Sequence, residues 1–277
     1  MKKVYLIYLV FASLLMQSCN KIDDKLIPIA AKDWYGKRIL IEDYTGHRCP
    51  NCPAAAIVAS DLKALYGDKI VVIAVHAGYF AEPKPLLNFP EDFRTTAGTE
   101  WDNFFGISNA GNPNGLINRV GFPTTTHIIN PNAWAAKVGS LLTEIPEVEI
   151  EITPNFNTST NILTGQVKTK FLKTIKKKLK LQIVITEDSI IAPQQNASTI
   201  VVDYVHRHVL RGALNDSWGS ELTNGLANSY IDTEILTPIS SFAIDPTKWK
   251  TKHCTIVAFV YDDNTKEILQ VAEKHIE

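Results

Sequence analysis

The chain has 277 residues, of which 45% are hydrophobic and 21% are charged. This composition supplies a packed core and excludes wholesale disorder, and the length is comfortable for two domains. The 28 basic and 29 acidic residues leave a formal net charge of −1. A chain with this balance has no global electrostatic attraction for nucleic acid, so no nucleic-acid partner is expected.

The first residues have the pattern of an export signal. Two lysines precede an apolar run from Val4 to Met16, which is too short to span a bilayer, and Gln17-Ser18-Cys19 follows. A cleaved secretion signal is one interpretation. The preferred one is a resemblance to bacterial lipoprotein signals, because a cysteine stands where cleavage is expected. Residues 1–18 would then be the signal peptide, Cys19 would carry acyl chains such as palmitate, and residues 19–32 would form a polar tether.

The next element is a strand that leads into a Cys-x-x-Cys motif. A β-branched, apolar segment over Arg38–Tyr44 precedes Cys49 and Cys52, which begin a helix predicted over Cys49–Tyr66. Cysteines three residues apart come close enough for a disulfide only at a helix start or in a tight turn. The positive end of the helix and the adjacent Arg48 favour a thiolate. This arrangement is typical of thioredoxin-type redox sites, and a purely structural disulfide is the alternative.

A second strand is predicted over Lys69–His76, where the continuous apolar run indicates burial on both faces. A long insertion follows, with helical character around Glu91–Phe105. A further apolar run begins after Asn112 and Pro113, and a short strand is predicted over Thr126–Asn130. A helix is then expected from Pro131 onward.

This order of elements resembles the thioredoxin fold and predicts an α/β thioredoxin-like domain over residues 33–145. In that fold a buried acid lies six residues before the first cysteine, where Asp43 stands. A cis-proline precedes the third core strand, where Pro113 stands. Pro123, in a Gly-Phe-Pro-Thr sequence, is the alternative cis-proline.

The resemblance also implies roles for the site residues. Cys49, expected to be the more exposed thiol, would attack or be attacked, and Cys52 would resolve the mixed disulfide. Asp43 would move the proton, since burial raises the pKa of a carboxyl group. The substrate-binding residues would be Arg48, His76, Asn112 and Pro113. Two purely structural alternatives remain open. Asp43 would then only cap or hydrogen-bond at the end of its strand, and His76 would only cap the end of the second strand.

The pattern changes after Pro146. Residues 148–152 alternate between apolar and acidic side chains. Further strand-like runs occur at residues 163–171, 179–186, 200–210, 231–236, 255–261 and 268–272. About seven short strands without helical periodicity indicate an all-β, immunoglobulin-like sandwich over residues 147–277.

Three further groups of residues are weaker candidates for a functional role. His206 and His208 fall on one face of a predicted strand, but no third metal ligand is visible, so a polar strand face is preferred. Cys254 lies in an apolar run and is interpreted as a buried small hydrophobe. The lysine-rich residues 173–180 could contact lipid phosphates, although a solvated turn is the default. We predict no metal and no cofactor.

Taken together, the motifs resemble the thioredoxin-like outer-membrane lipoproteins named after a twenty-eight-kilodalton outer membrane protein of anaerobic Gram-negative bacteria. The matching segments are residues 42–53, 76–80, 115–119 and 208–219. The resemblance implies a lipid-anchored outer-membrane protein, facing the periplasm or the exterior. We expect it to exchange disulfides with protein thiols and disulfides. A non-catalytic binding or adhesion lipoprotein, with the redox fold as scaffold, is the alternative.

Overall fold

The computed structural model describes residues 36–223 and 230–277. These described residues cluster as one compact unit. The predicted signal peptide, Cys19 and the whole predicted tether lie outside the described residues.

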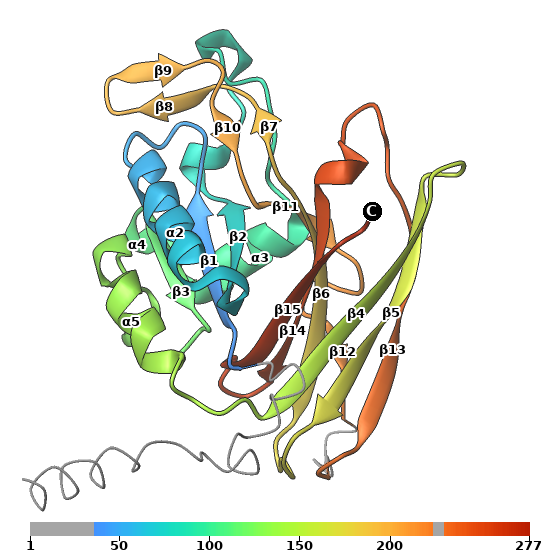
Figure 1. Ribbon diagram of the computed structural model, residues 1–277. Coiled ribbons are helices and arrows are strands. Elements are labelled where there is room, and N and C mark those ends of the chain that lie inside the picture. The colour runs from blue at the N-terminus through green and yellow to red at the C-terminus, as the bar shows by residue number, and fades with distance from the viewer. Residues whose placement is uncertain (1–35, 224–229) are drawn as a thin grey trace, which may run out of the picture. The chain divides into compact units, whose positions relative to one another are not determined.

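An eight-stranded mixed sheet forms the centre of this unit (Figure 1). Its main path runs in the order β15-β14-β6-β11-β2-β1-β3, and β12 pairs with β6. β1 and β2 are parallel, as are β2 and β11, whereas the other neighbours along the path are antiparallel. The strands are β1 (Ile39–Thr45), β2 (Ile70–His76), β3 (Asn114–Ile117), β6 (Leu179–Glu187), β11 (Val209–Ala213), β12 (Ser220–Glu221), β14 (Cys254–Asp262) and β15 (Ile268–His275).

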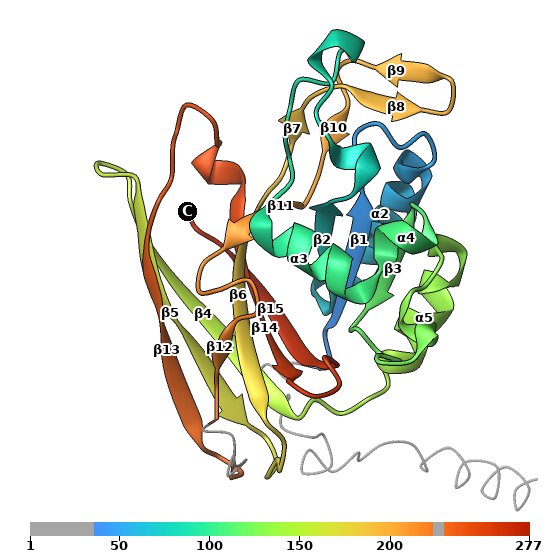
Figure 2. The same cartoon turned by 180° about the vertical axis from the view of Figure 1, so that it is seen from behind.

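Helices cover both faces of the first half of the sheet (Figure 2). α2 (Cys52–Tyr66) and α5 (Trp134–Leu141) pack on one face through apolar residues such as Ala59, Leu62 and Val138. α3 (Thr96–Phe105) packs on the opposite face through Trp101 and Phe105. The short α4 (Ile107–Ala110) follows α3. α2 ends at Gly67, whose φ of 57° suits a residue without a Cβ.

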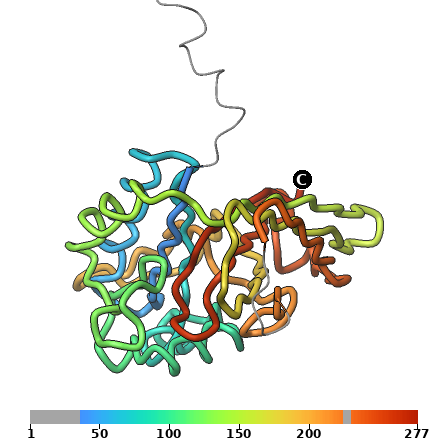
Figure 3. Tube along the Cα trace, turned by 90° about the horizontal axis from the view of Figure 1, so that it is seen from below, coloured from blue at the N-terminus to red at the C-terminus, as the bar shows by residue number. Residues whose placement is uncertain are grey.

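A separate three-stranded sheet covers the second half. It consists of β4 (Val148–Asn157), β5 (Ile162–Phe171) and β13 (Glu234–Ala243) in the order β13-β5-β4. Alternating residues of these strands pack against β6, β14 and β15 in one apolar cluster. Figure 3 shows the blue and green first half beside these yellow, orange and red strands. The observed class is therefore mixed α/β with mostly strands.

The central sheet continues across the domain boundary expected at residues 145–147. Val209 of β11 pairs with Ala74 of β2, and the Ala74 N–H donates to the His208 carbonyl at 2.8 Å. The alternation after Pro146 is confirmed by β4, but the two halves share one sheet. Separate domains over residues 33–145 and 147–277 remain a prediction.

Two predicted strands are wrong in detail. Residues 126–130 form no strand: residues 125–127 make a 3₁₀ turn, and Ile129 makes only an isolated bridge with Gly115. The strand expected over residues 200–210 is broken into three short pieces, because each piece pairs with a different strand. These pieces are β9 (Thr199–Val201), β10 (Val205–His206) and the beginning of β11.

The broken segment belongs to an arm formed by residues 190–208. Two small antiparallel pairs make up this arm: β7 (Ile190–Ile191) with β10, and β8 (Gln194–Asn196) with β9. Figure 1 and Figure 2 both show these pairs beyond the end of β1 and the start of α2. The arm thus places residues from the second half of the chain over the Cys-x-x-Cys motif.

Candidate functional site around Cys49 and Cys52

Cys49 and Cys52 form a disulfide, with their Cα atoms 5.4 Å apart. The helix begins at Cys52 rather than at Cys49, with Asn51 as its N-cap residue. Cys49 therefore lies in the preceding turn, where its N–H donates to the Gly46 carbonyl at 2.9 Å. The first helical turn offers few free N–H groups, because Pro53 has none and the Ala54 N–H donates to the Asn51 carbonyl at 3.2 Å.

The expectation that Cys49 is the more exposed thiol is wrong. Cys49 and Cys52 are each only 1% exposed. The arm covers Cys49, and the Gln194 side-chain amide donates to the Cys49 carbonyl at 3.1 Å. Backbone hydrogen bonds continue this contact, from Gln195 N–H to the His47 carbonyl at 2.7 Å and from Ala197 N–H to the Pro50 carbonyl at 2.9 Å. Sequence reasoning missed Gln194, since nothing local connects it with a motif 145 residues away.

Asp43 is buried on β1, with 3% of its surface exposed. Burial raises the pKa of its carboxyl group to about 7, and its Oδ1 atom has no hydrogen-bond partner among the described residues. Its neighbours in register are Ala74 on β2 and Gly115 on β3, which carry little or no side chain. A Cβ at Gly115 would come within 2.6 Å of Trp134, so this position requires glycine. Trp134 thus fills the Gly115 side, whereas the small Ala74 side chain leaves space beside the carboxyl group on the β2 side.

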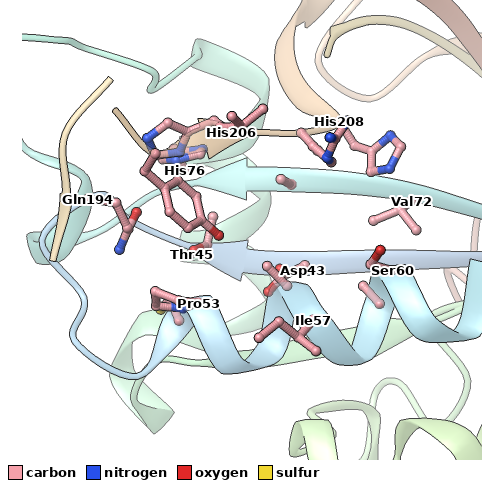
Figure 4. A pocket seen from close by; sticks show the side chains of 17 residues that line it. Asp43, Thr45, Pro53, Ile57, Ser60, Val72, His76, Gln194, His206 and His208 are labelled. Atoms are coloured by element: carbon pink, nitrogen blue, oxygen red, sulfur yellow. The ribbon is translucent and has the colours of Figure 1, made fainter. Parts of the chain in front are cut away.

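A cavity of about 270 Å³ occupies that space, between α2, the sheet and the arm (Figure 4). Asp43 and Cys52 both line it, whereas Cys49 does not. The helix contributes Pro53, Ile57 and Ser60, the sheet Val72 and His76, and the arm Tyr204 to His208.

His76 ends β2 beside this cavity and belongs to an aromatic cluster with two partners from other elements. Its ring lies 5.0 Å from Phe93 and 5.6 Å from His206. Burial lowers the pKa of His76 well below its ordinary value, and it lowers the pKa of His206 to about 4. Both imidazoles are therefore neutral at physiological pH and contribute no cation to the site.

His206 and His208 do not share a strand face, contrary to the expectation. β10 ends at His206, and His208 adopts a left-handed conformation with a φ of 54°. The His208 Nδ1 atom lies 3.3 Å from Asp188. Among residues 36–223 and 230–277, no group of three or more histidine, cysteine or acidic side chains could hold a metal ion.

The remaining predicted residues lie around the same end of the sheet. Arg48 donates to the Tyr79 carbonyl, and its guanidinium lies 4.5 Å from the centre of the Tyr79 ring and 3.7 Å from Glu82. This ion pair offsets the charge expected to stabilise a thiolate. The peptide bonds before Pro113 and Pro123 are both cis, and Pro113 directly precedes β3. Substrate binding by Asn112 and Pro113 stays a prediction.

Two groups outside the site have ordinary structural roles. Cys254 is fully buried, as expected, and burial raises the pKa of its thiol to about 12. The lysine-rich segment is paired with acidic side chains, as Lys173 lies 2.9 Å from Glu147 and Lys178 lies 3.3 Å from Asp263. These pairs favour the solvated turn over a lipid contact.

Comparison with protein families matches residues 100–277 to the outer membrane protein Omp28. The chain belongs to the Omp28 family. This confirms the resemblance inferred from the sequence motifs. The match covers the arm and the second half of the chain, and Cys49 and Cys52 lie outside it. Membership in the Omp28 family therefore does not bear on the reactivity of the cysteine pair.

Two solved structures similar to this Omp28-family chain come from Porphyromonas gingivalis. HBP35 has 17% identity and a TM-score of 0.61, over 87% of this chain and 76% of that chain, which shows a likeness of fold alone. A domain of the outer membrane lipoprotein Omp28 has 26% identity and a TM-score of 0.34, over 48% of this chain and 91% of that chain. No curated protein matches. In the described part of the chain, no helix has the length and apolar character needed to cross a membrane.

Proposed function

We propose that this chain is a lipid-anchored outer-membrane protein that carries out thiol–disulfide exchange at Cys49 and Cys52. One observation carries the proposal: the buried Asp43 carboxyl and Cys52 line the same cavity, at the start of the helix that holds the disulfide. An acid with a pKa of about 7 can hold or release a proton at neutral pH. A structural disulfide has no need of such a group.

The finer fold assignment belongs to the same proposal. We interpret β1, α2, β2 and β3, with α3 and α5 on the two faces, as a thioredoxin-like layer over residues 33–145. The packing of β4, β5 and β13 against β6, β14 and β15 supports an immunoglobulin-like sandwich for residues 147–277. Asp43 would exchange a proton with Cys52, and Arg48, His76, Asn112 and Pro113 would contact a protein thiol or disulfide.

The experiment is exchange between the oxidised protein and a glutathione redox buffer, followed by mass spectrometry. Asp43→Asn should slow resolution of the mixed disulfide by about 10²–10⁴-fold, which is the usual contribution of general acid–base catalysis. Asp61→Asn is the matched control, because Asp61 is an exposed acid on α2. Exchange that is equally fast in Asp43→Asn and wild type would contradict a catalytic role.

The location rests on family membership and on the sequence before Asn20. A lipid anchor at Cys19 would supply most of the membrane affinity, since a protein without one would have to bind the membrane through its folded surface. Cys19→Ala should move the protein from the detergent phase to the aqueous phase in detergent partitioning. Unchanged partitioning would exclude this anchor.

A second candidate is a binding or adhesion protein with a structural disulfide. The observation that favours it is the 1% exposure of both cysteines beneath the arm. In that case the disulfide should resist reduction in the folded protein, and reduction should occur only with global unfolding. Reduction rates measured across a urea titration separate the two functions.

A further inference from the structure

The arm covers the disulfide on the Cys49 side, whereas a cavity adjoins it on the Cys52 side. Over Cys49, Gln194 and the backbone of the β8–β9 hairpin bond to residues 46–50. Beside Cys52, the cavity of about 270 Å³ separates α2 from the arm. A reagent that leaves the arm in place therefore meets Cys52 first.

The cavity has the features of a binding site for a small molecule. Asp43 is more than nine-tenths buried in its wall, and its Oδ1 atom lacks a hydrogen-bond partner among the described residues. Figure 4 shows Asp43, Ile57 and Ser60 between β1 and α2. The volume of about 270 Å³ lies just below the usual range for small-molecule sites, about 300–1,000 Å³. It fits a molecule of a few carbon atoms, whereas a folded protein or an extended peptide would have to displace the arm.

We propose that a low-molecular-weight thiol reduces this site by entering the cavity and attacking Cys52. The proposal rests on the redox function proposed above and names its electron donor. It differs from the sequence-based expectation, in which Cys49 is the sulfur that reacts first. Cys49 remains the sulfur that a protein substrate would meet once the arm moves.

The chemistry balances with two molecules of thiol. The Asp43 carboxylate takes the proton of the first thiol, and the resulting thiolate attacks the Cys52 Sγ atom. The Cys49–Cys52 bond breaks, Cys49 leaves as a thiolate, and a mixed disulfide forms between Cys52 and the small molecule. A second thiolate attacks the sulfur of the small molecule and releases a small-molecule disulfide. Cys52 takes its proton from Asp43, and Cys49 takes the proton of the second thiol through solvent.

The first test fills the cavity. Ile57 is 62% exposed at the cavity wall, so Ile57→Trp should fold while narrowing access to Cys52. Leu65→Trp is the matched control, because Leu65 is 71% exposed on the same helix and does not line the cavity. Reduction of the oxidised protein by 2-mercaptoethanol should slow about tenfold or more in Ile57→Trp and be unchanged in Leu65→Trp, since exchange rates depend on access. Equal rates in Ile57→Trp and wild type would overturn the proposal.

The second test identifies the reacting sulfur. The single-thiol variants Cys49→Ser and Cys52→Ser are treated with 2-hydroxyethyl disulfide, and the mixed disulfides are counted by mass spectrometry. Cys52 in the first variant should react about tenfold faster than Cys49 in the second, because access controls the rate. Faster trapping by Cys49 would overturn the proposal and leave the redox function intact. No trapping by either thiol would overturn both.

Discussion

The side chain of Gln194 donates a hydrogen bond of 3.1 Å to the backbone carbonyl of Cys49. The same amide also lies 3.4 Å from the Gly46 carbonyl. Gln194 is 3% exposed, so these carbonyl groups have little access to water as a substitute donor. The two residues fix the arm onto the turn that holds the first cysteine.

Gln194→Ala should therefore loosen the arm. Buried acceptors that lose their donor cost about 1–3 kcal/mol of stability. In the reduced protein, labelling of Cys49 by a bulky maleimide should increase, as measured by mass spectrometry. Gln195→Ala is the control, because the Gln195 side chain donates within the hairpin, to the carbonyls of Ala197 and Thr199. Equal labelling of Cys49 in both variants would show that Gln194 does not hold the arm.

Asp43 should make stability depend on pH. Burial raises its pKa to about 7, so the folded protein keeps this proton to about pH 7, whereas the unfolded chain loses it near about pH 3.9. Between these values the folded state binds more protons, and this contribution to stability is lost as pH rises. The difference between the folded and unfolded pKa values of Asp43 contributes at most about 4 kcal/mol to the free energy of unfolding.

Asp43→Asn removes the pH dependence that the Asp43 carboxyl group contributes to stability, because an amide does not titrate. The stability of the variant relative to wild type should rise between about pH 5 and about pH 8, because only wild type then acquires a buried charge. Urea unfolding of the oxidised proteins at the two pH values measures it. Asp61→Asn should show no such rise. A constant difference between Asp43→Asn and wild type would mean that Asp43 has an ordinary pKa.

Arg119 and Glu42 form a buried ion pair on the α3 face of the sheet. The Arg119 Nε and Nη2 atoms donate to Glu42 at 2.8 and 2.7 Å, and both side chains are at most 1% exposed. The guanidinium also lies 5.1 Å from the ring centres of Trp101, Phe105 and Phe259. The pair thus lies among aromatic side chains with little water.

Arg119→Met should destabilise the fold by about 3–5 kcal/mol, because Glu42 keeps a buried charge without a partner. Combining it with Glu42→Gln should restore part of that loss, as urea unfolding will show. Arg94→Met is the control: Arg94 forms an exposed pair with Asp92, and its removal should cost less than about 1 kcal/mol. A double variant as unstable as the sum of its single variants would contradict the coupling.

Because the two halves of the chain share one sheet, we expect them to stay associated after the connection between them is cleaved. Ile145 is 75% exposed in the connection between α5 and β4, so a protease site placed there should be cut in the folded protein. The two fragments should elute together in size-exclusion chromatography and separate only in urea, because β11 pairs with β2 and apolar residues of both halves share one cluster. Separation without denaturant would instead show two independent domains.

Local patterns determined much of this protein. The alternation and apolar runs located β1, β2, β4, β5, β6 and β14, because side chains of a strand point to opposite faces in turn. The spacing of Cys49 and Cys52 indicated their disulfide, and the resemblance to the thioredoxin fold identified Asp43 as the buried acid six residues before Cys49. These signals work because the residues involved are close in sequence.

Only the tertiary structure decided how the site is covered and from which side it is open. No periodicity or motif connects Gln194 with Cys49, His206 with His76, or Val209 with Ala74, since each contact joins segments more than a hundred residues apart. The β-branched residues near 200–210 predicted one long strand, but the arm breaks it to reach the Cys-x-x-Cys turn. The sequence by itself therefore determined the disulfide and the nearby acid. The burial of both sulfurs, and the cavity that reaches only Cys52, follow from packing between the two halves of the chain.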